Sequence, residues 1–195
     1  IVREGDPEWR EDVPVRVESI PVRRDGRVLA VIARNTNLLT VRTPSRLELT
    51  YLQSASDLAQ MIATGAFPFP DEQGDMDASP RVGDGLIRLD AQGIVQYASP
   101  NALSAYHRLG LAADLVGLHL GQVTGQLAPP RGPVDEAIVK LASGYAPRKT
   151  EVEGKDCVIQ LRVIPLKPKG ERIGSLILLR DVTELRRRER ELITK

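Results

Sequence analysis

The chain has 195 residues, and its 27 Lys and Arg nearly balance its 26 Asp and Glu. A formal net charge of +1 gives no electrostatic reason to expect direct binding of nucleic acid or of anionic lipid. Hydrophobic residues make up 42% of the chain, which is enough for an ordinary aliphatic core. The first residue is not Met, so we expect a part of a longer protein.

The sequence also gives indications of the compartment. No run reaches the roughly 20 apolar residues that a membrane span needs, and no signal peptide opens the chain. The single cysteine, Cys157, excludes an internal disulfide framework and a Cys-rich zinc site, and it fits a reducing compartment. These features predict a cytoplasmic location without a membrane segment.

The first third of the chain predicts a hairpin followed by a helix. Residues 13–33 contain alternating valines, a turn at Arg24-Asp25-Gly26-Arg27 and a second apolar run, which is typical of a β-hairpin. Apolar residues then recur at helical spacing over 47–62. Ser45 is the candidate N-cap of this long amphipathic helix, and Gly65 is its stop.

Residues 66–82 are rich in proline and acidic residues and have little apolar content, so we interpret them as an interdomain linker. The predicted organisation has four parts. They are a partial α+β segment at 1–65, the linker at 66–83, a compact domain at 84–182 and the start of a helix at 183–195.

The sequence of the compact domain predicts strands and helices in a specific order. The expected strands cover residues 86–90, 94–98, 147–152, 158–165 and 172–180. The expected helical segments cover 100–109, one or two short turns within 115–123, and 134–143. Helices grouped between the second and third strands predict an α+β domain, with one five-stranded antiparallel sheet and helices on one face.

The run Gly85-Leu86-Ile87-Arg88-Leu89-Asp90-Ala91-Gln92-Gly93-Ile94-Val95-Gln96-Tyr97-Ala98-Ser99-Pro100-Asn101-Ala102 resembles the start of a PAS domain. In that family a strand, an Asp-x-x-Gly turn, a second strand and an Asn at the start of a helix follow one another. The resemblance assigns the turn to Asp90 and Gly93 and the helix start to Asn101.

Two later segments extend this resemblance over residues 84–184. Leu115-Val116-Gly117 is similar to a helix of the family, and Leu179-Arg180-Asp181-Val182-Thr183-Glu184 is similar to the signature that closes a PAS domain. The chemistry of the signature supports a rigid junction, because Thr183 can cap a helix beginning at Glu184 and Asp181 can accept hydrogen bonds from backbone amides. We therefore predict that Asp181, Thr183 and Glu184 transmit a signal from sheet to helix.

Residues 13–63 resemble the last third of a GAF domain, in which a final hairpin precedes a long helix. Together with residues 97–108, this order is similar to the sensor half of actinobacterial soluble histidine kinases of the PdtaS type. The resemblance implies a kinase module after Lys195, and we expect the protein to form a homodimer. With ATP and Mg²⁺, that module would phosphorylate its own His and then an Asp of a response regulator.

The last residues predict a short helix with two alternative roles. Leu185 and Leu192 form a stripe that suits a parallel dimer helix leading to the next domain, whereas the alternative is a surface helix on the sheet. Arg186-Arg187-Arg188 is flanked by Glu184 and Glu189, and this pattern is typical of a solvated helix face.

A search for chemistry within the chain finds no set of catalytic, cofactor or metal residues. A haem version of the fold would place a His on the helix at 134–143, and a photochemical flavin version would need a Cys on the preceding helices, whereas Cys157 lies at a strand. His107 and His119 lack metal-ligand spacing, and Gly83-Asp84-Gly85 precedes a strand where a phosphate loop would precede a helix. We expect no cofactor in these residues.

Other functions stay open from the sequence. Arg88, Tyr97 and Arg162 are candidates for polar contacts to a small molecule held between sheet and helices, or they face solvent. The sensor would equally suit a serine phosphatase or a diguanylate cyclase, because fold does not settle function. A ligand-free dimerisation scaffold is the third alternative.

Overall fold

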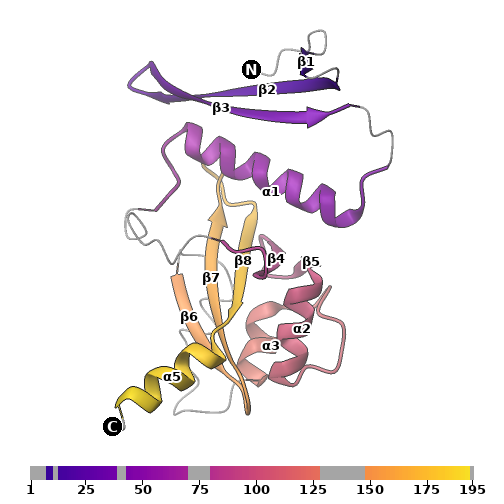
Figure 1. Cartoon of the computed structure of the whole chain (residues 1–195), viewed down its shortest axis with the longest axis vertical. Coiled ribbons are helices and arrows are strands. Elements are labelled where there is room, and N and C mark those ends of the chain that lie inside the picture. The colour runs from indigo at the N-terminus through magenta and orange to yellow at the C-terminus, as the bar shows by residue number, and fades with distance from the viewer. Residues whose placement is uncertain (1–7, 11–12, 39–42, 70–79, 128–147, 194–195) are drawn as a thin grey trace. The chain divides into compact units, whose positions relative to one another are not determined.

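The computed structural model describes residues 8–10, 13–38, 43–69, 80–127 and 148–193. The chain divides into two compact units, residues 1–73 with 167–170 and residues 74–166 with 171–195, and each is described by itself (Figure 1). In the part of the chain that these ranges cover, no helix combines the length and apolar content needed to cross a membrane.

The first unit contains a three-stranded antiparallel sheet in the order β1-β2-β3. The strands are β1 (Glu8–Arg10), β2 (Val13–Arg24) and β3 (Arg27–Asn37). Asp25 and Gly26 connect β2 to β3, and both have positive φ, as a two-residue turn between twisted strands favours. The predicted hairpin is therefore confirmed, and its second strand runs four residues further than expected because Thr36 and Asn37 still pair with β2.

Helix α1 (Arg46–Ala63) follows in the same unit. The Ser45 hydroxyl accepts a hydrogen bond from the Glu48 amide at 3.2 Å, and the Glu48 carboxylate accepts one from the Ser45 amide at 2.7 Å. This reciprocal pair satisfies two amides at the helix start, so the predicted N-cap is confirmed. Gly65, with φ of 76°, lies just beyond the end of the helix, as expected.

The second unit has one five-stranded antiparallel sheet in the order β5-β4-β8-β7-β6. The strands are β4 (Gly85–Asp90), β5 (Val95–Ala98), β6 (Arg148–Glu153), β7 (Val158–Leu166) and β8 (Gly174–Asp181). Helices α2 (Pro100–Leu109) and α3 (Leu120–Leu127) lie on one side of this sheet in Figure 1, and α5 (Thr183–Ile193) follows β8. The expected α+β architecture is confirmed, and the helix expected at 134–143 lies outside the described residues.

The position of α3 differs from the sequence-based expectation of helical turns at 115–123. The segment before α3 pairs with β5 through its backbone: the Val95 amide donates to the Leu118 carbonyl at 2.9 Å, and the Gly117 amide donates to the Val95 carbonyl at 2.9 Å. Since these groups bond to a neighbouring segment, the α-helix begins only at Leu120.

The core of this unit lies between the sheet and helices α2 and α3. It is formed by alternate strand positions, because successive side chains of a strand point to opposite faces. The buried strand residues of this cluster include Ile87, Leu89, Leu161, Val163, Ile177 and Leu179, and the helices add Ala102, Tyr106, Leu109, Leu120 and Val123. The Tyr106 hydroxyl is fully buried and lies 2.7 Å from the Thr124 hydroxyl, which satisfies both polar groups inside an apolar core.

Candidate functional site

The junction between β8 and α5 is held by the Asp181 side chain. One carboxylate oxygen accepts hydrogen bonds from the Thr183 amide at 3.0 Å and from the Thr183 hydroxyl at 2.5 Å. The other oxygen forms an ion pair with Arg108 at the end of α2. Asp181, the last residue of β8, therefore contacts both the first turn of α5 and a helix of the core.

The Thr183 hydroxyl also ties the junction to β7. It accepts a hydrogen bond from the Val158 amide at 3.0 Å, and the Val182 amide donates to the Val158 carbonyl at 2.9 Å. This differs from the expectation that Thr183 caps a helix beginning at Glu184, because α5 begins at Thr183 itself and the hydroxyl bonds across to a strand. The start of α5 is thus fixed to two strands of the sheet.

The third predicted junction residue, Glu184, has a less direct place. Its side chain is largely exposed and lies 3.9 Å from Arg187 in the same helix. A carboxylate in the first turn is favourable for the helix dipole, so Glu184 stabilises the beginning of α5.

Asp90 and Gly93 form the turn between β4 and β5, as the resemblance implied. One Asp90 oxygen accepts hydrogen bonds from the Gln92 and Ile94 amides, each at 2.9 Å, and the other accepts from the Gln96 side chain at 3.0 Å. Gly93 has φ of 83°, a conformation that side chains disfavour. These contacts give both residues a structural place in the turn.

Asn101 lies at the second position of α2, and its side-chain amide donates to the Gly83 carbonyl at 3.2 Å. The N-cap is Ser99, whose hydroxyl accepts from the Ala102 amide at 3.4 Å and from the Leu86 amide at 2.9 Å. The helix start is therefore attached to β4 by Ser99 and to the segment before β4 by Asn101.

Arg88, Tyr97 and Arg162 lie on the sheet face opposite the helices. Arg88 is the register partner of Tyr97, and both alternate with residues of the core cluster, as does Arg162. They therefore do not point into the space between sheet and helices, where a ligand pocket was expected. Arg162 instead lines a pocket on that face, together with Asp84, Lys149, Gln160, Leu178, Leu179 and Arg180.

An ion pair that sequence reasoning missed joins Asp84 to Arg180. The guanidinium contacts both carboxylate oxygens, at 2.9 and 2.7 Å, and the Arg81 amide donates to the carboxylate at 2.8 Å. Burial by itself raises the pKa of Asp84, but the hydrogen bonds from Arg180 and Arg81 outweigh burial, so its pKa lies below the usual value. The pair fastens the segment before β4 to β8.

A second missed contact joins α5 to β6. The Arg186 guanidinium donates to both carboxylate oxygens of Glu151 and also contacts Glu189. These hydrogen bonds lower the pKa of Glu151 despite its partial burial, and they raise the pKa of Arg186. The interpretation of 186–188 as a solvated face is therefore wrong for Arg186, whereas Arg187 and Arg188 are exposed as expected. Two patterns in the sequence indicate this contact. Side chains alternate between the two faces of β6, and arginines recur four residues apart along α5.

The remaining reactive residues have ordinary surroundings. Cys157 is buried, with 3% of its surface exposed. His107 is exposed, and His119 accepts a hydrogen bond from the Gln122 amide at 3.4 Å. Across the described residues, no three His, Cys, Asp or Glu side chains are grouped so as to hold a metal ion.

An antiparallel sheet covered by helices on one face, with a bonded Asp-x-Thr junction leading into an outgoing helix, defines a PAS-type sensory module. The family model described as PAS fold matches residues 80–187, more than half of the chain, and the chain belongs to this family. The family model described as histidine kinase PdtaS, GAF domain, matches residues 1–55.

Individual relatives agree with these matches. The chain is 42% identical over 182 residues to the sensor histidine kinase PdtaS of Mycolicibacterium smegmatis, covering 92% of this chain and 36% of the relative. It is 44% identical over 184 residues to the sensor histidine kinase PdtaS of Mycobacterium tuberculosis, covering 92% and 37%. The chain thus spans little more than a third of these relatives.

A solved structure described as the sensor region of a sensor histidine kinase superposes with a TM-score of 0.76 at 42% identity, over 87% of this chain and 66% of that one. These findings confirm the predicted resemblance to PdtaS-type proteins. They also confirm a PAS domain preceded by a GAF-like segment and a sensory, regulatory role for the chain.

Proposed function

We propose that the chain passes the state of its PAS domain, through the Asp181–Thr183 junction and α5, to a histidine kinase module downstream of it. The observation that carries the proposal is the bonding of Asp181. A single carboxylate contacts the first turn of α5 and, through Arg108, the end of α2 in the core. A shift of α2 relative to the sheet therefore acts directly on the residue that fixes the start of α5.

The buried Tyr106–Thr124 pair supports the core as the place where an input acts. Tyr106 lies two residues before Arg108 on α2, and its hydroxyl is 2.7 Å from that of Thr124 on α3. The pair links α2 to α3, so a small molecule that displaced this contact would act on α2 directly. We propose an unidentified small molecule as the input of the domain.

We propose that the downstream module uses ATP and Mg²⁺ to phosphorylate its own His and then transfers the phosphate to an Asp of a response regulator. The support is the identity of 42% and 44% with proteins named sensor histidine kinase PdtaS, over segments that cover most of this chain. This support favours a kinase over a phosphatase, a cyclase or a scaffold. A kinase that needs ATP and a response regulator works in the cytoplasm, which is the location we propose.

We further propose that the protein acts as a homodimer. Leu185 and Leu192 are seven residues apart on α5, and they are 54% and 75% exposed. Two apolar side chains at heptad spacing on the exposed side of an outgoing helix suit pairing with a second copy. Sedimentation equilibrium of the chain with Leu185→Glu and of the unsubstituted chain tests this, because the charged variant shifts a dimer toward monomer.

The experiment that tests the proposed output is autophosphorylation of the protein extended to its natural C-terminus, with labelled ATP and Mg²⁺ in excess. We expect a phosphoprotein whose phosphate is lost in acid and retained in base, as phosphohistidine requires. A phosphate that is stable in acid, or no phosphate at all, would overturn the proposal.

A further inference from the structure

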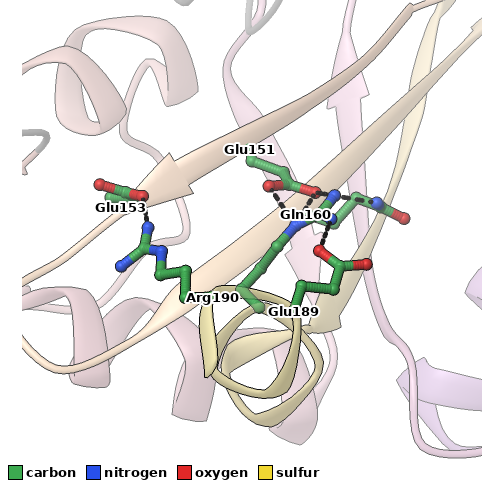
Figure 2. Close-up of polar contacts among 6 residues, drawn as sticks. Glu151, Glu153, Gln160, Glu189 and Arg190 are labelled. Carbon is green, nitrogen blue, oxygen red and sulfur yellow. Dashed lines mark hydrogen bonds and ion pairs between the residues drawn. The ribbon is translucent and has the colours of Figure 1, made fainter. Parts of the chain in front are cut away.

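Helix α5 is joined to the edge strand β6 by two ion pairs. Arg186 Nε lies 2.9 and 3.1 Å from the two carboxylate oxygens of Glu151, and Arg190 Nη2 lies 2.6 Å from a carboxylate oxygen of Glu153. Figure 2 shows Arg190 extending from α5 to Glu153. We call these two pairs the latch.

The two pairs of the latch match in spacing. Glu151 and Glu153 are two residues apart on a strand, so they share a face and lie about 6.7 Å apart along it. Arg186 and Arg190 are four residues apart on a helix, so they share a face and lie about 6 Å apart along the axis. Both pairs form in only one register of helix and strand, and a slide of α5 by one turn breaks that register.

The attachment of α5 uses charge and little apolar burial. In its described span, 183–193, none of the side chains of α5 is buried. Both pairs remain accessible to water, with side-chain exposures of 34% for Arg186 and 67% for Arg190. Ion pairs of this kind are weak and are screened by salt, so the docked helix is easily released.

Each side of the first pair keeps a second partner when the latch opens. Arg186 also contacts Glu189 on its own helix, and Gln160 on β7 donates to the Glu151 carboxylate at 3.4 Å (Figure 2). Neither charge is left without a polar contact after release. This lowers the free-energy difference between docked and released helix and makes the contact suited to switching.

We infer that the latch is a regulatory contact that sets how long α5 stays docked on the sheet and thereby sets the output of the module that follows. Its regulatory meaning rests on the proposed function, whereas the docking itself does not. The junction at Asp181 and Thr183 lies at the N-terminal end of α5 and remains closed when the latch opens. Release therefore frees the C-terminal part of α5 while its first turn stays fixed.

The docking is tested by hydrogen exchange of the α5 amides in the chain as it stands. Arg186→Glu with Arg190→Glu speeds this exchange roughly fivefold or more, because both pairs become repulsive. The swap that adds Glu151→Arg and Glu153→Arg restores exchange to within about twofold of the original. Arg188→Glu, at an exposed position of α5, is the matched control for Arg186→Glu alone, since each reverses one arginine.

Equal exchange of the α5 amides in Arg186→Glu and in Arg188→Glu overturns the inference. A second measurement covers the case in which the swap variant does not fold. Raising NaCl from about 0.05 to about 0.5 M speeds α5 exchange in the original chain and leaves the variant with reversed arginines nearly unchanged. An equal response of both proteins to salt refutes the latch.

The regulatory part is tested by the autophosphorylation rate of the C-terminally extended protein. We expect the arginine reversal to change this rate and the swap to restore it. Unchanged rates, when exchange shows release, refute regulation by the latch and leave the proposed kinase output intact. Absence of phosphohistidine in every protein, the unsubstituted one included, refutes the proposed function and leaves the exchange result for the latch standing.

Discussion

Replacement of Asp181 by Ala tests the junction most sharply within the chain itself. The substitution removes the acceptor of the Thr183 amide, a contact of the kind made by helix caps, which stabilises by about 1 kcal/mol. It also removes the ion pair with Arg108, which adds at most about 1 kcal/mol, because both side chains are partly exposed. The expected loss in the free energy of unfolding is therefore between about 1 and 2 kcal/mol.

Urea unfolding with a constant m-value measures this loss, and two variants divide it. Arg108→Ala removes only the ion pair and is expected to cost between about 0 and 1 kcal/mol. Asp181→Asn keeps an oxygen that accepts from the Thr183 amide, so it loses about half as much as Asp181→Ala. A loss below about 0.5 kcal/mol for Asp181→Ala, or an equal loss for Arg108→Ala, would refute the assigned role of the amide contact.

Two further predictions concern packing and pH. Gly85→Ala places a Cβ 2.7 Å from the Ala102 backbone nitrogen, so we expect it to lower the free energy of unfolding in urea by about 2–3 kcal/mol. The control Gly83→Ala has nothing within 4 Å of its added Cβ, and we expect it to change this free energy little. The pKa values of Asp84 and Glu151 are lowered in the folded chain, so the two carboxylates stabilise the folded state. This contribution to the free energy of unfolding is fully present above the ordinary pKa values of 3.8 and 4.5, and it is lost as the pH falls through the lower pKa values of the folded chain. The urea midpoint, measured between about pH 6 and 3, follows this loss. We expect the midpoint of Asp84→Asn to depend less on pH than that of the unsubstituted chain. An equal pH dependence of the two midpoints would contradict the stabilising role of the Asp84 carboxylate.

The features that the sequence predicted well are those encoded by neighbouring residues. The turn at Asp25 and Gly26 and the N-cap at Ser45 depend on local backbone geometry, and the structure confirms both. The order of strands around Asp90 followed from short-range alternation and turn chemistry in the same way.

The features that the sequence did not predict depend on residues far apart in the chain. Helix α3 begins later than expected because the preceding segment bonds to β5. Arg186 was assigned to solvent because its partner Glu151 lies 35 residues earlier, and only the direction in which α5 leaves the sheet brings them together. The Thr183 hydroxyl bonds to Val158 for the same reason.

The measurement that tests the central claim most directly is the rate of autophosphorylation of the C-terminally extended protein with Asp181→Ala, at a temperature where the variant remains folded. Because Asp181 fixes the start of α5, we predict a change of at least about fivefold from the unsubstituted rate, and a rate within about twofold for the control Gly83→Ala. An Asp181→Ala rate equal to that of the control would contradict the claim that this junction passes the state of the PAS domain to the kinase.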